Sequence, residues 1–89
     1  MKDLRLATKF KRDFKRIAKR DYDLDRLEVV IDLLREDEVL ETKYRDHALK
    51  GDWVDFRECH IAPDWLLIYQ ATDDELLLAR TGSHADLFE

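Results

Sequence analysis

The apolar residues of this chain change their spacing part-way along it, and that change constrains the fold more than any other feature. Up to residue 34 they recur every three or four positions, which is the period of an amphipathic helix. From residue 53 onward they alternate with polar residues or form short runs, as they do in β-strands. A chain with helical segments first and strands afterwards is predicted to adopt an α+β fold.

Two helices are predicted over residues 8–37. Thr8 can cap the start of the first helix and Asp23 the start of the second, because short polar side chains accept hydrogen bonds from free amides there. The first helix has an apolar stripe of Phe10, Phe14, Ile17 and Ala18. The second has an apolar face of Leu24, Leu27, Val30, Ile31, Leu33 and Leu34. Before both, residues 2–7 alternate briefly, which indicates a short strand.

Three strands are predicted after a loop over residues 39–52. The alternation over 53–61 places Glu58 and His60 on one face of the first strand and Cys59 on the other. Residues 65–69 form an unbroken apolar run typical of a central strand, and residues 76–81 form the third strand. Short turns join these segments, so the strands form an antiparallel meander. Ser83 can cap a final helical turn.

The length and composition predict one soluble domain over residues 1–89. The longest apolar run has five residues, whereas a membrane-spanning helix needs about 20. The start of the chain does not resemble a signal peptide. The one cysteine, Cys59, cannot form an internal disulfide, which favours a reducing compartment. A cytoplasmic protein is therefore expected.

The formal net charge of −5 conceals a strong asymmetry. Residues 1–20 contain nine basic and two acidic side chains, whereas the rest of the chain contains seven basic and nineteen acidic ones. A chain charged in this way can present one basic surface to an acidic partner or to a phosphate backbone. The same basic residues could equally form a solvated helix face with no partner.

The three histidines all fall within residues 47–84. Antiparallel strands reverse direction, so the end of strand 53–61 and the end of strand 76–81 meet at one edge of the sheet. We expect that edge to gather His60, Asp64, Arg80 and His84. His47 lies in the preceding loop and could reach the same group, but its spacing does not require it.

Imidazoles beside an arginine suit general acid–base chemistry on a phosphodiester. They titrate near pH 6.5, so one can accept a proton while another donates one, and a guanidinium can stabilise charge on the phosphoryl oxygens. RNA supplies its own nucleophile in the 2′-hydroxyl, without a metal or cofactor. The alternatives are structural histidines and a three-histidine zinc site, although the close ligand spacings that often build such a site are absent.

Three sequence blocks resemble the YafQ branch of the RelE toxin superfamily. They are residues 46–53 (DHALKGDW), 56–69 (FRECHIAPDWLLIY) and 80–88 (RTGSHADLF). The resemblance covers residues 44–88, and the two preceding helices fit the architecture of the family. The chain departs from the family in two respects: it has Glu58 where the motif usually has aspartate, and it is acidic whereas the family is usually basic.

The resemblance implies a RelE-like fold and a bacterial type II toxin. Such a toxin is an endoribonuclease that cuts mRNA on the ribosome by 2′-hydroxyl attack, leaves a 2′,3′-cyclic phosphate, and uses no metal or cofactor. It would be neutralised by a DinJ-like antitoxin in a hetero-oligomer. The basic helix over residues 8–20 would face mRNA and ribosomal RNA.

The resemblance also assigns roles to individual residues. His84 would be the general acid, His47 and His60 would share general-base and charge-stabilising roles, and Asp64 would orient a histidine or the substrate. Arg80 would hold the scissile phosphate. The expected substrate-binding residues are Glu58, Trp65 and Phe88. The alternative is a toxin-fold module with weak or no catalysis that binds an antitoxin, which Glu58 and the acidic composition favour.

Overall fold

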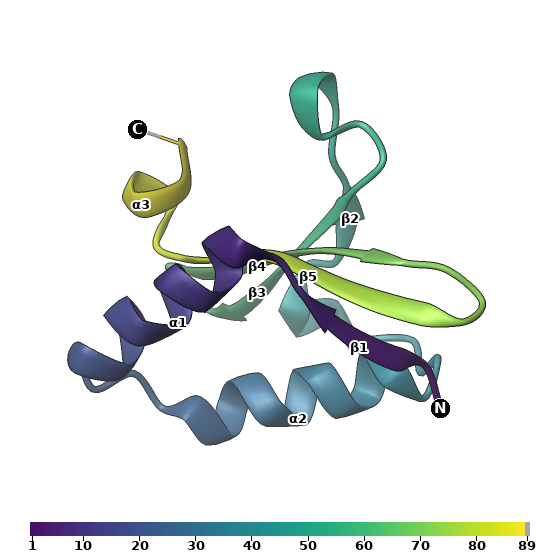
Figure 1. Ribbon diagram of the computed structural model, residues 1–89, viewed down its shortest axis with the longest axis horizontal. Coiled ribbons are helices and arrows are strands. Elements are labelled where there is room, and N and C mark those ends of the chain that lie inside the picture. The colour runs from purple at the N-terminus through teal and green to yellow at the C-terminus, as the bar shows by residue number, and fades with distance from the viewer. Residues whose placement is uncertain (89) are drawn as a thin grey trace.

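The computed structural model describes residues 1–88, so Glu89 of the expected domain lies outside the described residues. Five strands form one mixed sheet in the order β1-β5-β4-β3-β2 (Figure 1). The elements are β1 (Asp3–Leu6), α1 (Thr8–Lys19), α2 (Leu24–Arg35), η1 (Thr42–Tyr44), β2 (His47–Ala48), η2 (Gly51–Trp53), β3 (Arg57–Ala62), β4 (Trp65–Ala71), β5 (Glu75–Gly82) and α3 (His84–Phe88). The α+β expectation is confirmed.

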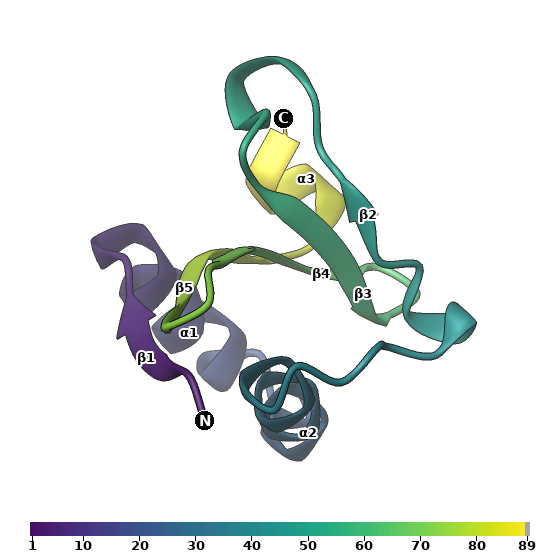
Figure 2. The ribbon, with the colours of Figure 1, turned by 90° about the vertical axis from the view of Figure 1, so that its right-hand side faces the viewer.

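The sheet separates the molecule into two sides. β3, β4 and β5 form the predicted antiparallel meander, while β1 pairs with β5 in parallel and β2 pairs with β3 in antiparallel fashion. The side chains of α1 and α2 join the core on one face of the sheet. The segment carrying β2 and η2, together with α3, rises on the other side (Figures 1 and 2). No helix within residues 1–88 has the length and apolarity needed to cross a membrane.

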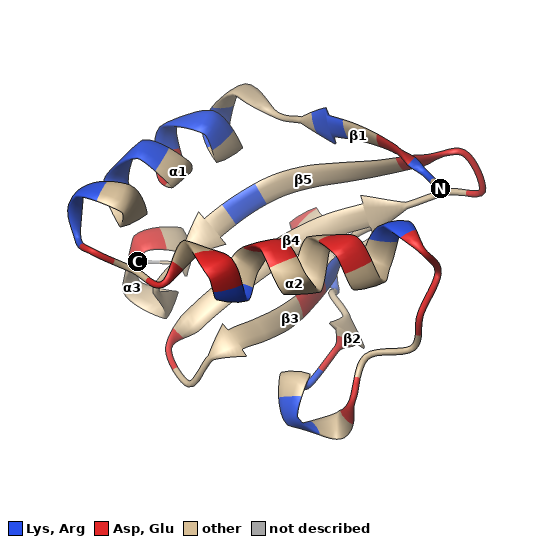
Figure 3. Cartoon of the chain, turned by 90° about the horizontal axis from the view of Figure 1, so that it is seen from below, with Lys and Arg blue, Asp and Glu red and all other residues tan. Residues whose placement is uncertain are grey.

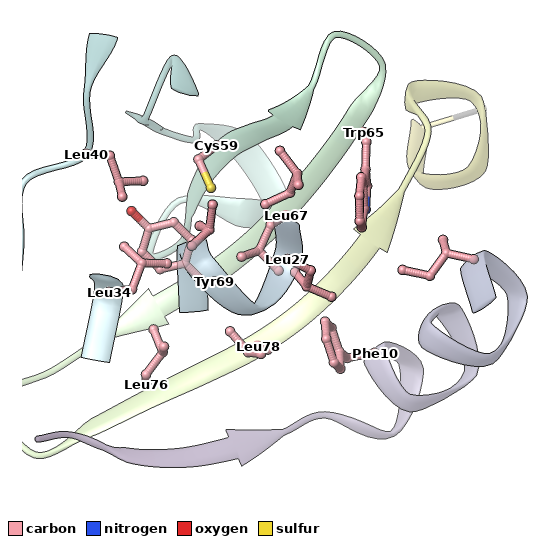
Figure 4. Close-up of a cluster of buried hydrophobic side chains, with 13 residues drawn as sticks. Phe10, Leu27, Leu34, Leu40, Cys59, Trp65, Leu67, Tyr69, Leu76 and Leu78 are labelled. Atoms are coloured by element: carbon pink, nitrogen blue, oxygen red, sulfur yellow. The ribbon is translucent and has the colours of Figure 1, made fainter. Parts of the chain in front are cut away.

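The main core lies between the sheet and the two long helices (Figure 4). β4 is buried from Trp65 to Tyr69, as its unbroken apolar run predicts for a central strand. Burial of this apolar surface is the main favourable contribution to folding. Cys59 is fully buried in the same cluster, and burial raises the pKa of its thiol to about 12, so the thiol stays protonated and unreactive. The side chains that fill the core from the helices and β5 are Phe10, Ile17, Leu27, Val30, Leu34, Leu76 and Leu78.

The helices agree with the sequence in position but not in every detail. Asp23 caps α2 as predicted, because its Oδ1 accepts a hydrogen bond from the Asp25 amide at 3.2 Å. The prediction that Thr8 caps α1 is wrong, since Ala7 occupies the cap position without a side-chain hydrogen bond. The predicted stripe of α1 is also partly wrong. Phe14 is 38% exposed, and Asp13 is buried instead.

The segment before β3 differs from the expected loop and long strand. Residues 39–52 contain β2 and η1, and the strand predicted from residue 53 begins only at Arg57. Trp53 and Phe56 pack edge to face with ring centroids 5.2 Å apart, and the Phe56 N–H donates to the Trp53 carbonyl oxygen at 2.8 Å. That turn takes up the Phe56 amide, so it cannot pair across the sheet.

Replacing Thr81 by valine should lower the free energy of unfolding by about 1–3 kcal/mol, because it leaves buried polar groups without partners. The Thr81 hydroxyl accepts from Trp65 Nε1 at 2.9 Å and donates to the Leu66 carbonyl oxygen at 2.8 Å. Urea unfolding measures the change. The exposed Thr42→Val is the matched control, with a shift within about 0.5 kcal/mol. An equal, small shift for both variants would contradict the role given to Thr81.

Candidate active site

The candidate catalytic side chains lie on the sheet face opposite the main core. Residues directly opposite each other on neighbouring strands project from the same face. The register pairs His47 with Glu58, Glu58 with Ile68, and Ile68 with Arg80, which makes one row across β2 to β5. Neighbouring strands are about 4.8 Å apart, so the backbones of Glu58 and Arg80 are separated by roughly 10 Å.

A second row lies next to the first. His60 pairs with Leu66, which pairs with Gly82, and His84 follows two residues later at the start of α3. The end of β3 and the end of β5 therefore meet at one edge of the sheet, as the meander predicts. Leu66 and Ile68, both buried, form the apolar floor between the polar side chains of the two rows.

Glu58 lies between two imidazoles. Its Oε2 is 3.6 Å from His47 Nε2, and its Oε1 is 3.8 Å from His60 Nε2. The Glu58 side chain is only 9% exposed, whereas His47 is open to solvent. His47 is fixed from its other side, because its Nδ1–H donates to the Arg45 carbonyl oxygen at 2.8 Å. This arrangement orients both rings around one carboxylate and brings His47 into the group.

Asp64 holds the start of α3 in place. It lies in the turn between β3 and β4, and its Oδ1 accepts a hydrogen bond from the His84 backbone N–H at 3.0 Å. The His84 ring packs against Phe88 with centroids 5.0 Å apart, and both side chains are exposed. The hydrogen bond from the His84 N–H therefore holds His84 at the β3–β4 turn, because Asp64 follows Ala62 by two residues and His60 by four.

Arg80 is bound to a carboxylate from α1. Its Nε is 2.6 Å from Asp13 Oδ2 and its Nη2 is 3.1 Å from Asp13 Oδ1, which is a bidentate pair. Asp13 also accepts from Arg16 and from the Thr81 amide. The hydrogen bonds to Asp13 raise the pKa of Arg80, so the guanidinium is charged at every accessible pH. Two of its nitrogens are occupied, and Nη1 is not among the atoms that contact Asp13.

Asp86 fastens α3 to α1. Its Oδ2 accepts from Arg20 at 2.8 Å and from the Ser83 amide at 3.1 Å, while Ser83 Oγ accepts from the Asp86 amide. The predicted Ser83 cap is therefore confirmed as one half of a reciprocal capping box. Burial raises the pKa of Asp86, but the hydrogen bonds from Ser83 and Arg20 outweigh burial and lower it overall. The orientation of His84 thus depends on contacts with α1.

Similarity to known proteins extends over almost the whole chain. Residues 2–89 match the family described as bacterial toxin of type II toxin–antitoxin system, YafQ. The chain belongs to this family. Over 88 residues it is 39% identical to the mRNA interferase toxin YafQ of Escherichia coli K12, covering 98% of this chain and 96% of that relative.

Solved structures agree with the YafQ assignment. A copper-bound mutant toxin from Helicobacter pylori matches with a TM-score of 0.94 and 48% identity, covering 99% of this chain and all of that one. The toxin in a DinJ–YafQ complex of Escherichia coli matches with a TM-score of 0.91 and 38% identity over the whole of both chains. The RelE-like architecture expected from the sequence is confirmed by this likeness.

Trp65, which the sequence analysis of this YafQ-family chain expects to bind substrate, lies in the core. Trp65 is 4% exposed and packs edge to face on Tyr22, and its indole N–H donates a hydrogen bond to the Thr81 hydroxyl. It also lines a small hollow beside Asp64, which makes it a wall of that hollow. Within residues 1–88, no three His, Cys, Asp or Glu side chains are grouped so as to hold a metal ion.

Two positioning residues of this YafQ-family chain escaped the sequence analysis. Asp13 lies between Phe10 and Ile17 on the buried face of α1, and an acidic residue at such a position needs a buried cationic partner. An acidic residue on the apolar face of a helix is therefore visible in the sequence, but the sequence does not show which cation pairs with it. Asp86 sits three residues after Ser83, which is the capping-box spacing, but nothing in the sequence links it to Arg20.

Proposed function

We propose that this YafQ-family toxin is an mRNA interferase that cuts messenger RNA on the ribosome. The observation that carries the proposal is the row of His47, Glu58 and Arg80 on one face, with His60 beside it and His84 at the adjoining edge. The Escherichia coli relative is named an mRNA interferase toxin, which supports the same activity here. Because ribosomes are the site of action, the toxin would work in the cytoplasm.

The first chemical step is removal of the proton from the 2′-hydroxyl. His47 and His60 share this role: a neutral imidazole accepts the proton as the 2′-oxygen forms its bond to phosphorus. Glu58 contacts both rings, so it orients them and stabilises the positive charge that one of them gains. The guanidinium of Arg80 faces the phosphoryl oxygens, where negative charge increases in the transition state.

The second chemical step is departure of the 5′-oxygen. The bond between phosphorus and O5′ breaks, and a protonated His84 donates its proton to that oxygen, leaving a 2′,3′-cyclic phosphate and a 5′-hydroxyl end. Asp64 holds the His84 backbone, and Phe88 packs against the imidazole. The chain's own side chains account for both proton transfers, so the step needs no metal or cofactor.

The partners follow from the family and the charge distribution. The Escherichia coli YafQ toxin was solved in complex with DinJ, and we propose that a DinJ-like antitoxin forms a hetero-oligomer with this chain. Lys and Arg are concentrated on α1 and the strand before it, whereas Asp and Glu are frequent on α2 (Figure 3). The basic helix over residues 8–20 is the surface that we propose for contact with ribosomal RNA.

A ribosome-dependent cleavage assay tests the proposed function. Purified toxin added to translating ribosomes with a defined messenger should yield cut transcripts. The cleavage should persist when EDTA is added, provided that Mg²⁺ is kept in excess over EDTA so that the ribosomes stay intact. Cleavage that stops when EDTA removes trace transition metals would indicate a metal enzyme. No cleavage under any condition would contradict the interferase assignment.

The second candidate is an antitoxin-binding module without catalysis. Glu58 stands where the family motif usually has aspartate, and the net charge of −5 weakens long-range attraction to RNA. Glu58→Asp distinguishes the two functions. A module gains no activity from this change, whereas in an interferase the shorter carboxylate alters the cleavage rate measurably because both imidazoles contact it.

A further inference from the structure

We infer that the hollow between η1, α2 and the end of β3 binds the RNA nucleotide next to the scissile linkage. The basic hollow, as we call it, has a volume of about 630 Å³ and is lined by Arg26, Lys43, Tyr44, Arg45 and His60 among others. Ligand pockets usually enclose about 300–1,000 Å³, so a nucleotide fits. The inference rests on the proposed function and names a substrate subsite for it.

The position of the basic hollow links it to the catalytic side chains. β2 pairs with Arg57 and Glu58 of β3, and beyond Glu58 no strand within residues 1–88 pairs with that side of β3, where η1 lies instead. His60 lines the hollow and also contacts Glu58. The hollow therefore meets the catalytic side chains at one residue, His60, and a nucleotide that reaches His60 from the hollow adjoins the phosphodiester linkage that His60 would act on.

The basic hollow is positively charged, although the part of the chain that forms it is strongly acidic. After residue 20 there are only seven basic side chains against nineteen acidic ones, yet three of the seven line this one hollow. Among the described residues that line it, none is Asp or Glu. Arg26 and Lys43 have exposed partners, Asp23 at 3.8 Å and Glu41 at 3.9 Å. Such long surface pairs contribute little and yield readily to a phosphate.

The backbone of Arg45 supports a functional role for the hollow. Arg45 is left-handed, with φ 49° and ψ 44°, a conformation that side-chain-bearing residues adopt at a cost. Its carbonyl oxygen accepts from His47, and its side chain lines the hollow. One strained residue thus fixes a catalytic imidazole and a cation of the subsite together.

RNA fits the basic hollow better than an acidic peptide does. Tyr44 is half-buried against the core, and Lys43 Nζ lies over its ring, 5.2 Å from the centroid. A base that displaces Lys43 from that ring face can stack on it, a contact worth about 1–3 kcal/mol per base in single-stranded RNA complexes. The neighbouring hollow, which shares Arg26 and Ala62, contains Asp23 and Asp64 and so repels additional anions. A run of carboxylates would meet that repulsion, whereas one phosphate followed by a base would not.

The test measures binding without cleavage. The full ¹⁵N-labelled chain is titrated with a tetranucleotide that has 2′-O-methyl groups throughout and, separately, with hexaglutamate, while amide shifts and the Kd are recorded. We expect RNA to shift the amides of residues 43–45 and 60–62. The triple variant Arg26→Ala/Lys43→Ala/Arg45→Ala, which lacks three cations, should bind RNA at least about tenfold more weakly. The slope of log K against log salt concentration should become shallower by about two.

The control removes cations that lie outside both the hollow and α1. Arg5→Ala/Lys50→Ala alters two exposed cations and should weaken binding of the tetranucleotide less than about twofold. A loss in this control as large as that in the triple variant, tighter binding of hexaglutamate at the same amides, or no RNA binding would each overturn the inference. Ribosome-dependent cleavage by the parent is scored separately. An inactive parent that still binds RNA in the hollow contradicts only the interferase, and an active parent that does not bind there contradicts only the subsite.

Discussion

His84→Ala should slow ribosome-dependent mRNA cleavage by about 10²–10⁴-fold, because the departing 5′-oxygen loses its proton donor. The His84 side chain is exposed, and the contact that holds this residue runs through its backbone N–H to Asp64, which alanine retains. The free energy of unfolding should therefore change by less than about 1 kcal/mol. Single-turnover cleavage and urea unfolding measure the two effects on the same preparation.

The matched control for His84→Ala is Asp73→Ala. Asp73 is exposed in the turn between β4 and β5, at the opposite end of β5 from His84. Its cleavage rate should stay within about twofold of the parent, since it lies far from both rows of polar side chains. A His84→Ala variant that cuts as fast as Asp73→Ala would show that another group protonates the leaving oxygen.

The spacing of apolar residues was sufficient to predict the two long helices and the three-stranded meander, but not β2 or the start of β3. The change from helical to alternating spacing placed two helices before an antiparallel meander, and a meander of short turns brings alternate strand ends together. That argument predicts His60 and His84 at one edge, and the register places His60 opposite Leu66 and Leu66 opposite Gly82, two residues before His84. Local sequence carries this information because both spacings arise from backbone geometry.

The contacts that orient the site could not be read from the sequence. β2 has only two residues, too few for any alternation, yet it brings His47 opposite Glu58. Asp13 is 67 positions from Arg80 along the chain, and no local pattern couples such distant residues. The structure supplies this coupling, because α1 packs beside the end of β5.

Asp13→Ala should lower the free energy of unfolding by about 3–5 kcal/mol, which is a large share of the stability of a chain this size. The Asp13 side chain is 4% exposed and that of Arg80 only 17%, so alanine leaves a largely buried guanidinium without its bidentate partner. The Thr81 amide loses its acceptor as well. Urea unfolding measures the loss, with the exposed Asp32→Ala on α2 as a control that should shift by no more than about 0.5 kcal/mol.

The double variant Asp13→Leu/Arg80→Met separates the effect on stability from the effect on cleavage. An apolar pair of similar size needs no compensating charge, so the part of the loss that comes from the unpaired guanidinium should return, while the Thr81 amide still lacks its acceptor. Cleavage should remain impaired by at least about 100-fold, because no guanidinium stabilises the phosphoryl oxygens. If the double variant recovered cleavage together with stability, Arg80 would be a structural partner of Asp13 alone. If Asp13→Ala unfolded like Asp32→Ala, the ion pair between α1 and β5 would contribute little to either stability or the site.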